Sequence, residues 1–460
     1  MSQLGPEPPR LMGLLALAWP VVVSRSSQVV VGFSDAVMVA TLGEESLAAT
    51  TTGSFNAFLL FILPMGTTFI VSSFSSQLFG RGRIEAARRY ALYALGFAAL
   101  TGLLLAVGRG LVPALLAPFD YAPRVRELMS TYLSIRLFAA FGAIGLEALA
   151  NFYAGLGNTR LPMLANVLAM GSNVALNWML IFGYLGAPAM GVAGAAWASV
   201  FSTTGAFLLL LFCFLRRVGQ PTDATPDADT KPRYLREIGR MLRFGLPSGI
   251  NWFLEMGAFM FFMNVVVAGL GTTALAAMNA VIQVNSVSFM PAFGLASAGA
   301  VLFGQNLGRG IQGYAVRAMW LTLGCAATWQ CAVGLSYLLL PGVIMGAFAA
   351  PEATEFLAIG ARILALSAAW QLFDAVANVL AESLRAAGDT AWTLWARIAI
   401  AWGFFVPASL YTVRTLEGGV VAAVICLGAY LGLLSAAMAY RFHSGRWKEM
   451  NLLEDEIVPM

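Results

Sequence analysis

Twelve long apolar segments leave this chain few folds to adopt. Each is long enough for an α-helix to cross the hydrocarbon core of a bilayer, which takes about 20 residues. Only 11% of the residues are charged and 59% are hydrophobic, whereas a soluble protein carries about 25% charged residues. We therefore predict an all-α integral membrane protein with twelve transmembrane helices. The segments lie near residues 12–39, 47–77, 89–108, 128–155, 161–185, 189–215, 242–268, 274–304, 314–345, 354–384, 391–413 and 419–443.

A polar, Pro-containing stretch over 216–240 separates the first six segments from the last six. Five landmarks recur in the same order on both sides, offset by 227 or 228 residues. The sequence therefore predicts two pseudo-symmetric six-helix bundles over 1–215 and 241–445, a cytoplasmic linker over 216–240 and a cytoplasmic tail over 446–460. The landmarks are Pro20, Leu42-Gly43, Leu47-Ala48-Ala49, Pro64 and Gln77 in the first half, and Pro247, Leu270-Gly271, Leu275-Ala276-Ala277, Pro291 and Gln305 in the second.

The distribution of Lys and Arg predicts the orientation. With the N-terminus and the linker in the cytoplasm, 20 of the 27 basic residues lie on the inner side, Arg385 and Arg397 among them. We expect a multi-pass protein of the bacterial inner membrane with both termini cytoplasmic. The first segment contains Pro20 and Arg25, so we interpret it as a retained helix and not as a signal peptide.

Polar side chains within the first six segments predict a cation site. Asp35 lies in the first segment, and Asn173 and Asn177 share a helix face with Asn166 in the fifth. Ser199 follows a run of small residues from Gly191 to Ala198 in the sixth, which permits close helix packing. A carboxylate, two amides and a hydroxyl supply the oxygen ligands that a small hard cation prefers, or set the proton affinity of the carboxylate.

The last six segments carry a different polar set. In the tenth segment the polar residues recur at three- and four-residue steps along one helix face, which must face protein or water and not lipid. We interpret Glu382 and Arg385 as an end pair, and Glu255 and Asp374 as functional carboxylates. The set comprises Ser248, Asn251 and Glu255 in the seventh segment, Asn279 and Gln283 in the eighth, and Gln371, Asp374, Asn378, Glu382 and Arg385 in the tenth, beside Trp370.

Arg25 is the basic residue placed well inside the first segment. A straight helix separates it from Asp35 by about 15 Å, too far for direct pairing. A carboxylate on another helix, such as Glu147, is the partner we expect, with Asn151 one turn further along. We interpret Arg25 as a structural counter-charge.

Several of these motifs together resemble the multidrug and toxic compound extrusion (MATE) transporters, especially their NorM branch. The resemblance covers nearly the whole chain. It is carried by Pro20 with Asp35, Gln77 and Gly80 with Gln305 and Gly308, Asn173 and Asn177 followed by Gly183 and the segment G-V-A-G-A-A-W-A-S, and Gln371 and Asp374 followed by L-R-A-A-G-D-T from Leu384 to Thr390.

The resemblance implies a cation-driven antiporter. In it, Asp35, Asn173, Asn177 and Ser199 form a site for Na+ or H+, while Glu255 and Asp374 are the membrane carboxylates of the second half. Ser199 stands where the family often has Thr, which keeps the hydroxyl. Trp370 stands where Tyr is common, which removes a phenol oxygen and weakens the case for Na+ there.

We thus predict an antiporter that couples Na+ or H+ entry to export of amphipathic organic cations, which contact Gln283, Asn279, Trp370, Gln371 and Asn378. The bilayer, the organic cation and the monovalent coupling ion are the expected partners of a monomer, with no cofactor and no nucleic acid. The alternative is a flippase or exporter of a lipid-linked metabolite. An enzyme is disfavoured because the chain has one histidine, His443, and no nucleophile–base or metal-ligand spacing.

Overall fold

The computed structural model describes residues 7–221, 234–348 and 353–453, and these residues form helices joined by short turns. Within these described residues, twelve helical stretches are long and apolar enough to cross a membrane. They start and end within eight residues of the predicted segments, so the all-α, twelve-span prediction is confirmed. For example, the second span covers Glu44–Gly80 and the twelfth Gly419–His443. Residues 222–233 of the predicted linker lie outside the described residues.

The chain groups into two compact units. The N-terminal unit is Val23–Gly249, and the C-terminal unit is Met1–Val22 together with Ile250–Met460. Helix α1 (Leu11–Ala40) therefore begins in the C-terminal unit and ends in the N-terminal one, and α10 (Tyr234–Phe261) does the reverse. These units are defined by which residues lie close together, whereas the predicted bundles were defined by the repeat in the sequence. The predicted limits of the bundles therefore stay a prediction.

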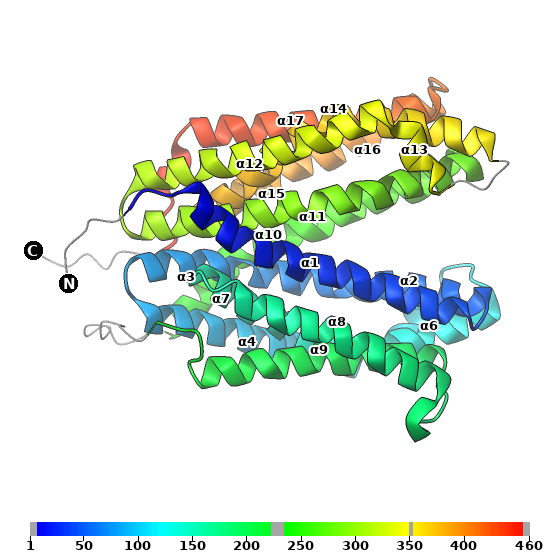
Figure 1. The fold of residues 1–460 in the computed structure, drawn as a ribbon, viewed down its shortest axis with the longest axis horizontal. Coiled ribbons are helices and arrows are strands. Elements are labelled where there is room, and N and C mark those ends of the chain that lie inside the picture. The colour runs from blue at the N-terminus through cyan, green and yellow to red at the C-terminus, as the bar shows by residue number, and fades with distance from the viewer. Residues whose placement is uncertain (1–6, 222–233, 349–352, 454–460) are drawn as a thin grey trace, which may run out of the picture. The chain divides into compact units, whose positions relative to one another are not determined.

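The N-terminal unit contains spans two to six. Its longest helices pack side by side in pairs, α8 on α9, α4 on α7 and α2 on α6 (Figure 1). The second span breaks at Phe69, five residues after Pro64, where α2 gives way to α3. The elements are α2 (Glu44–Thr68), α3 (Ile70–Gly80), α4 (Ile84–Val107), η1 (Gly108–Leu111), α5 (Val112–Leu116), α6 (Pro123–Arg136), η2 (Leu137–Ala139), α7 (Ala140–Gly155), α8 (Arg160–Phe182), η3 (Tyr184–Gly186) and α9 (Val192–Leu215).

The C-terminal unit is built around α14, which packs against α11, α12 and α17 (Figure 1). Two spans contain π-helical segments, η4 after α10 and η6 after α15. The elements are η4 (Phe262–Val267), η5 (Ala268–Leu270), α11 (Thr272–Gly308), α12 (Gln312–Leu339), α13 (Pro341–Gly346), α14 (Thr354–Ala387), α15 (Thr390–Ile400), η6 (Ala401–Phe405), α16 (Val406–Arg414), α17 (Gly419–His443) and η7 (Arg446–Glu449).

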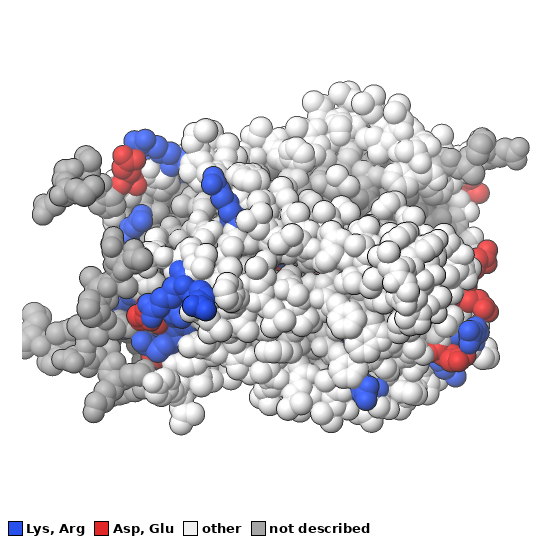
Figure 2. Space-filling model, turned by 60° about the horizontal axis from the view of Figure 1, so that its bottom comes forward, with Lys and Arg blue, Asp and Glu red and all other residues white. Residues whose placement is uncertain are grey.

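Charged side chains on the surface lie mostly near the ends of the helices on the face that Figure 2 shows. On the face shown in Figure 2, Lys, Arg, Asp and Glu gather near the helix ends and leave a broad uncharged region between them. Large apolar side chains such as Phe33, Leu103 and Val343 are exposed. Exposed apolar surface of this kind is stable only against lipid, as expected for membrane-spanning helices.

Glycine permits the close approach of α9 to α8. A Cβ atom at Gly194 would lie 2.4 Å from the carbonyl oxygen of Leu180 and 2.9 Å from the backbone nitrogen of Ile181. Both are backbone atoms, which cannot rotate aside. The run of small residues before Ser199 therefore sets the distance between the two helices, as the sequence predicted.

Replacing Gly194 with alanine should destabilise the N-terminal unit. The added methyl group must push α9 from α8, and such overpacking costs about 1–3 kcal/mol. The matched control is Gly205→Ala on the same helix, where a Cβ atom meets nothing within 4 Å. Thermal melting of the purified protein should fall by several degrees for G194A and stay or rise for G205A. Equal melting temperatures for the two variants would contradict the close contact.

Candidate cation sites

The N-terminal unit brings Asp35 on α1 together with three predicted partners. Asn177 on α8 donates a hydrogen bond from Nδ2 to Asp35 Oδ1, and Ser199 on α9 donates from Oγ to Asp35 Oδ2 at 3.3 Å. Asn173 Nδ2 donates to Ser199 Oγ at 3.3 Å, and its Oδ1 accepts from Asn177 at 3.1 Å. All four side chains are buried. Residues from three helices thus close into one polar cluster, as their types and spacing predicted.

The local sequence explains this geometry. Asn173 and Asn177 lie one turn apart on α8, so their amides point the same way. Gly183 ends α8 with a φ of 79°, a conformation that suits glycine, and the chain returns through Gly191 into α9. The tight contact at Gly194 then holds Ser199 opposite the two amides.

The cluster has a buried acceptor that the protein leaves unused. Asn177 Oδ1 has no hydrogen-bond partner among the described residues. A buried polar atom in this state costs free energy unless a ligand or water meets it. Together with the Asp35 carboxylate, Asn173 Oδ1 and Ser199 Oγ it forms a set of oxygen atoms that fits a small hard cation. The same carboxylate can instead take a proton.

Tyr132 and Arg136 on α6 complete the surroundings of Asp35, and sequence reasoning missed both as site residues. The Tyr132 hydroxyl lies 2.6 Å from Ser54 Oγ on α2, and the ring fits against Gly53. Arg136, one turn further along α6, is close enough to attract Asp35 electrostatically. Their spacing of four residues indicates that they share one face of α6. Only the packing of α6 shows that this face lies toward Asp35.

In the C-terminal unit, the carboxylate of Asp374 on α14 is held by amides. It accepts hydrogen bonds from Asn378 Nδ2 at 2.9 Å and from Gln330 Nε2 on α12 at 3.3 Å. Gln330 is buried, and its Oε1 has no hydrogen-bond partner among the described residues. Gln330 was not singled out by the sequence because it stands alone in an apolar helix.

Glu255 on α10 forms an ion pair with Arg397 on α15. The sequence analysis counted Arg397 among the basic groups at the inner helix ends. The structure corrects this interpretation, because Arg397 is buried within the eleventh span, Thr390–Arg414. Its carboxylate partner lies on another helix, so the spacing along the sequence gave no sign of the pair.

The other predicted residues divide between buried and exposed positions. Gln371 donates to Asn285 Oδ1 at 2.6 Å, and Trp370 is buried in the core of the C-terminal unit. Asn279 and Gln283 are exposed on α11, and the expectation that they contact the organic cation stays a prediction. Asn166 donates to the Pro162 carbonyl of its own helix. Ser248 is buried, Asn251 is half-buried, and Glu382 forms an ion pair with Arg385 as expected.

Arg25 pairs with Glu147, as expected. Its Nη2 lies 2.7 Å from Glu147 Oε1, and Asn151 Nδ2 donates to the same oxygen at 3.1 Å. The guanidinium lies 5.8 Å from the centre of the Phe69 ring. These contacts join α1, α7 and the break in the second span, which favours the structural interpretation.

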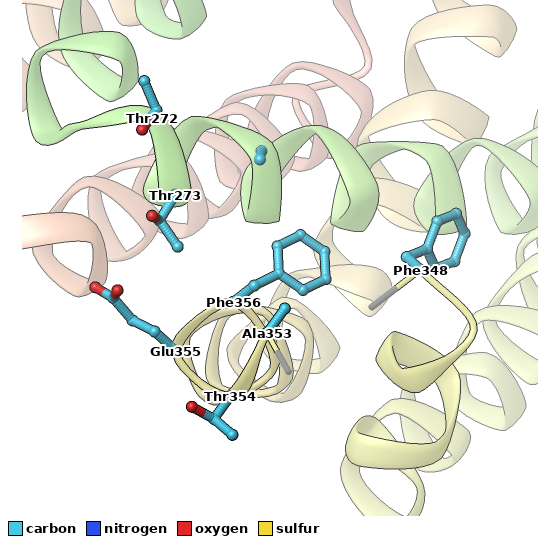
Figure 3. A pocket seen from close by; sticks show the side chains of 8 residues that line it. Thr272, Thr273, Phe348, Ala353, Thr354, Glu355 and Phe356 are labelled. Atoms are coloured by element: carbon cyan, nitrogen blue, oxygen red, sulfur yellow. The ribbon is translucent and has the colours of Figure 1, made fainter. Parts of the chain in front are cut away.

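An open pocket of about 610 Å³ lies elsewhere in the C-terminal unit. Figure 3 shows Thr354, Glu355 and Phe356 on the first turn of α14, with Thr272 and Thr273 on α11 nearby. Thr354 precedes Asp374 by about 30 Å along the helix. The pocket is therefore distinct from the Asp374 cluster.

Comparisons with known proteins agree on one family. A family model described as MatE matches residues 20–179 and 247–408. The multidrug resistance protein NorM of Burkholderia vietnamiensis is 29% identical and aligns over 93% of this chain and 92% of its own. The probable multidrug resistance protein NorM of Pseudomonas syringae pv. tomato is 26% identical over 97% of this chain and 96% of its own.

Solved structures share the fold. An outward-facing multidrug resistance MATE family transporter of the MOP superfamily superposes with a TM-score of 0.83 at 21% identity, covering 95% of this chain and 97% of that one. The eukaryotic MATE transporter AtDTX14 superposes with a TM-score of 0.80 at 18% identity, covering 95% and 96%.

The two amides at 166 and 177 provide a matched test of the Asp35 cluster. Asn177→Ala removes a hydrogen bond to a buried carboxylate, which is worth about 1.5–3 kcal/mol. Asn166→Ala removes only a bond to the carbonyl of its own helix. Thermal melting should fall clearly more for N177A than for N166A. The reverse order would contradict the assigned network.

Proposed function

The chain belongs to the MatE family of membrane transporters, and on this premise we propose that it exports amphipathic organic cations in exchange for Na+ or H+. Family membership makes the protein a multi-pass membrane transporter and not an enzyme. Its NorM relatives are named as multidrug resistance proteins, which supports export of several drugs. We place the protein in the bacterial inner membrane with both termini in the cytoplasm.

The observation that carries the proposal is the buried cluster around Asp35. A carboxylate in a membrane span is costly and marks a site that a cation visits. Asp35 is held by hydrogen-bond donors, and the cluster keeps an unused acceptor in Asn177 Oδ1. Asp35, Asn173, Asn177 and Ser199 form the coupling site in this proposal, while Asp374, with Glu255 beside it, serves the organic cation.

Exchange requires that the two cations oppose each other. A ligand that binds two conformations equally shifts neither, so the coupling ion must favour a conformation that binds the drug weakly. Asp35 lies on α1, which also contains Pro20 and passes from one unit to the other. We propose that ion binding at Asp35 changes the conformation of α1 and lowers the affinity for the organic cation.

Ethidium efflux from proteoliposomes tests the function directly. We expect efflux to respond to an imposed Na+ gradient or to an imposed pH gradient, and the gradient that works identifies the coupling ion. Protein-free liposomes are the control for leakage. A folded protein that responds to neither gradient would refute antiport and favour the flippase or metabolite exporter.

Asp35→Asn should abolish gradient-driven efflux and leave the fold intact. The amide keeps the shape of the side chain but loses the negative charge, and a lost charge-assisted contact of about 1.5–3 kcal/mol lowers ion affinity about tenfold or more. Asp120→Asn is the control, because Asp120 is exposed between two spans. Undiminished coupled efflux by D35N would rule out Asp35 as the coupling site.

A further inference from the structure

Arg397 adds a fixed positive charge to the carboxylates of the C-terminal unit. Its Nη1 atom pairs with Glu255 Oε1, and its side chain is 8% exposed against 35% for Glu255. It stands about 10 Å into the eleventh span, counted from Thr390. An arginine side chain is not deprotonated in proteins. The charge is therefore a permanent part of this site.

Aromatic packing holds the guanidinium in place. The Tyr430 hydroxyl on α17 is within hydrogen-bonding reach of Arg397. The Tyr430 ring stacks on Phe405 with centroids 5.0 Å apart, and Phe405 contacts Phe262 at 5.0 Å. All three rings are buried. Withdrawing Arg397 from Glu255 would disturb this packing.

The two helices joined by the ion pair share a second feature. Each contains a π-helical segment shortly after the charged residue, Phe262–Val267 after Glu255 and Ala401–Phe405 after Arg397. The ring contact between Phe262 and Phe405 connects these two segments. Such π-helical turns are frequent at functional sites. The ion pair is thus part of an irregular, tightly packed contact and not a chance surface pair.

The charges of Glu255, Asp374 and Arg397 can be balanced by one further positive charge. Asp374 lies close enough to Glu255 and Arg397 to interact with both electrostatically. When both carboxylates are ionised they contribute two negative charges, and Arg397 cancels one of them. Asp374 accepts hydrogen bonds from Asn378 and from Gln330, whose Oε1 has no partner among the described residues. In a low-dielectric site an uncompensated charge is costly, so the best ligand brings one positive charge.

Building on the proposed function, we propose that Arg397 is a tethered counter-cation that occupies Glu255 and restricts the site at Asp374 to ligands with a single positive charge. Glu255 then anchors Arg397 and is not itself a ligand of the transported cation. Gln330 and Asn378 orient Asp374 toward a monovalent organic cation. A dication leaves one of its charges unmatched and is bound more weakly.

Ethidium and propidium form a matched pair of probes, since both are fluorescent phenanthridinium dyes, with one and two positive charges respectively. Their binding to the purified, detergent-solubilised protein, followed by fluorescence anisotropy, does not depend on any gradient. Wild-type protein should bind ethidium more tightly. Wild-type protein that binds ethidium but fails to export it would count against antiport alone.

Charge-changing variants test the role of Arg397. Arg397→Met should shift the ratio of the two affinities toward propidium by about tenfold or more, since Glu255 becomes available. Arg397→Lys keeps the charge and should keep the ratio. Glu255→Gln makes the cluster neutral and should weaken ethidium binding about tenfold or more.

The double variant Glu255→Gln with Arg397→Met decides between the two roles of Glu255. It restores the net charge of minus one, and ethidium binding should return to within a few-fold of wild type. A double variant as weak as E255Q, with a normal size-exclusion profile, would overturn the proposal and make Glu255 a direct ligand. If R397M does not fold, R397K and the double variant still give the comparison. An unchanged dye ratio in folded R397M would reduce Arg397 to a structural role.

Discussion

A charge inside a bilayer has no water to solvate it, so each one requires a partner within the protein. Arginines within the spans meet that requirement with carboxylates, as in Arg25 with Glu147 and Arg397 with Glu255. Asp35 and Asp374 are held differently, by donors from amides and, at Asp35, from a hydroxyl. Such donors stabilise a carboxylate without cancelling its charge. In the proposed function, the two aspartates are therefore available to an arriving cation, which a tight ion pair would prevent.

The sequence predicted the spans because bilayer thickness dictates their length, and it predicted the shared face of Asn173 and Asn177 because of helical periodicity. The grouping of these amides with Asp35 and Ser199 came from their residue types and from the family resemblance. The sequence did not reveal Tyr132, Gln330 or the pairing of Arg397. These depend on which helices pack together, and that information lies in contacts between distant segments. Arg397 was assigned to the inner side of the membrane because a count of basic residues on each side assumes that they all lie at helix ends. Arg397 instead lies within a span.

The two units hold a carboxylate within the membrane spans by different sets of side chains. In each, an amide one helical turn from a second polar side chain takes part, Asn173 with Asn177 and Asp374 with Asn378. The N-terminal cluster adds a hydroxyl and gathers small, close oxygen atoms. The C-terminal cluster adds aromatic rings and a fixed guanidinium. The first composition favours a small hard cation. In our proposal, the fixed guanidinium of the second favours a monovalent ligand.

Stability alone does not explain the pair of Glu255 and Arg397. Burying two charges costs several kcal/mol each, and well-packed apolar residues of similar volume often give equal or greater stability. The rings of Phe262, Phe405 and Tyr430 already supply apolar contact between these helices. An apolar pair in place of the two charges would leave the net charge of the cluster unchanged. In our proposal, what such a pair could not provide is the fixed positive charge of Arg397, which repels the second charge of an incoming dication.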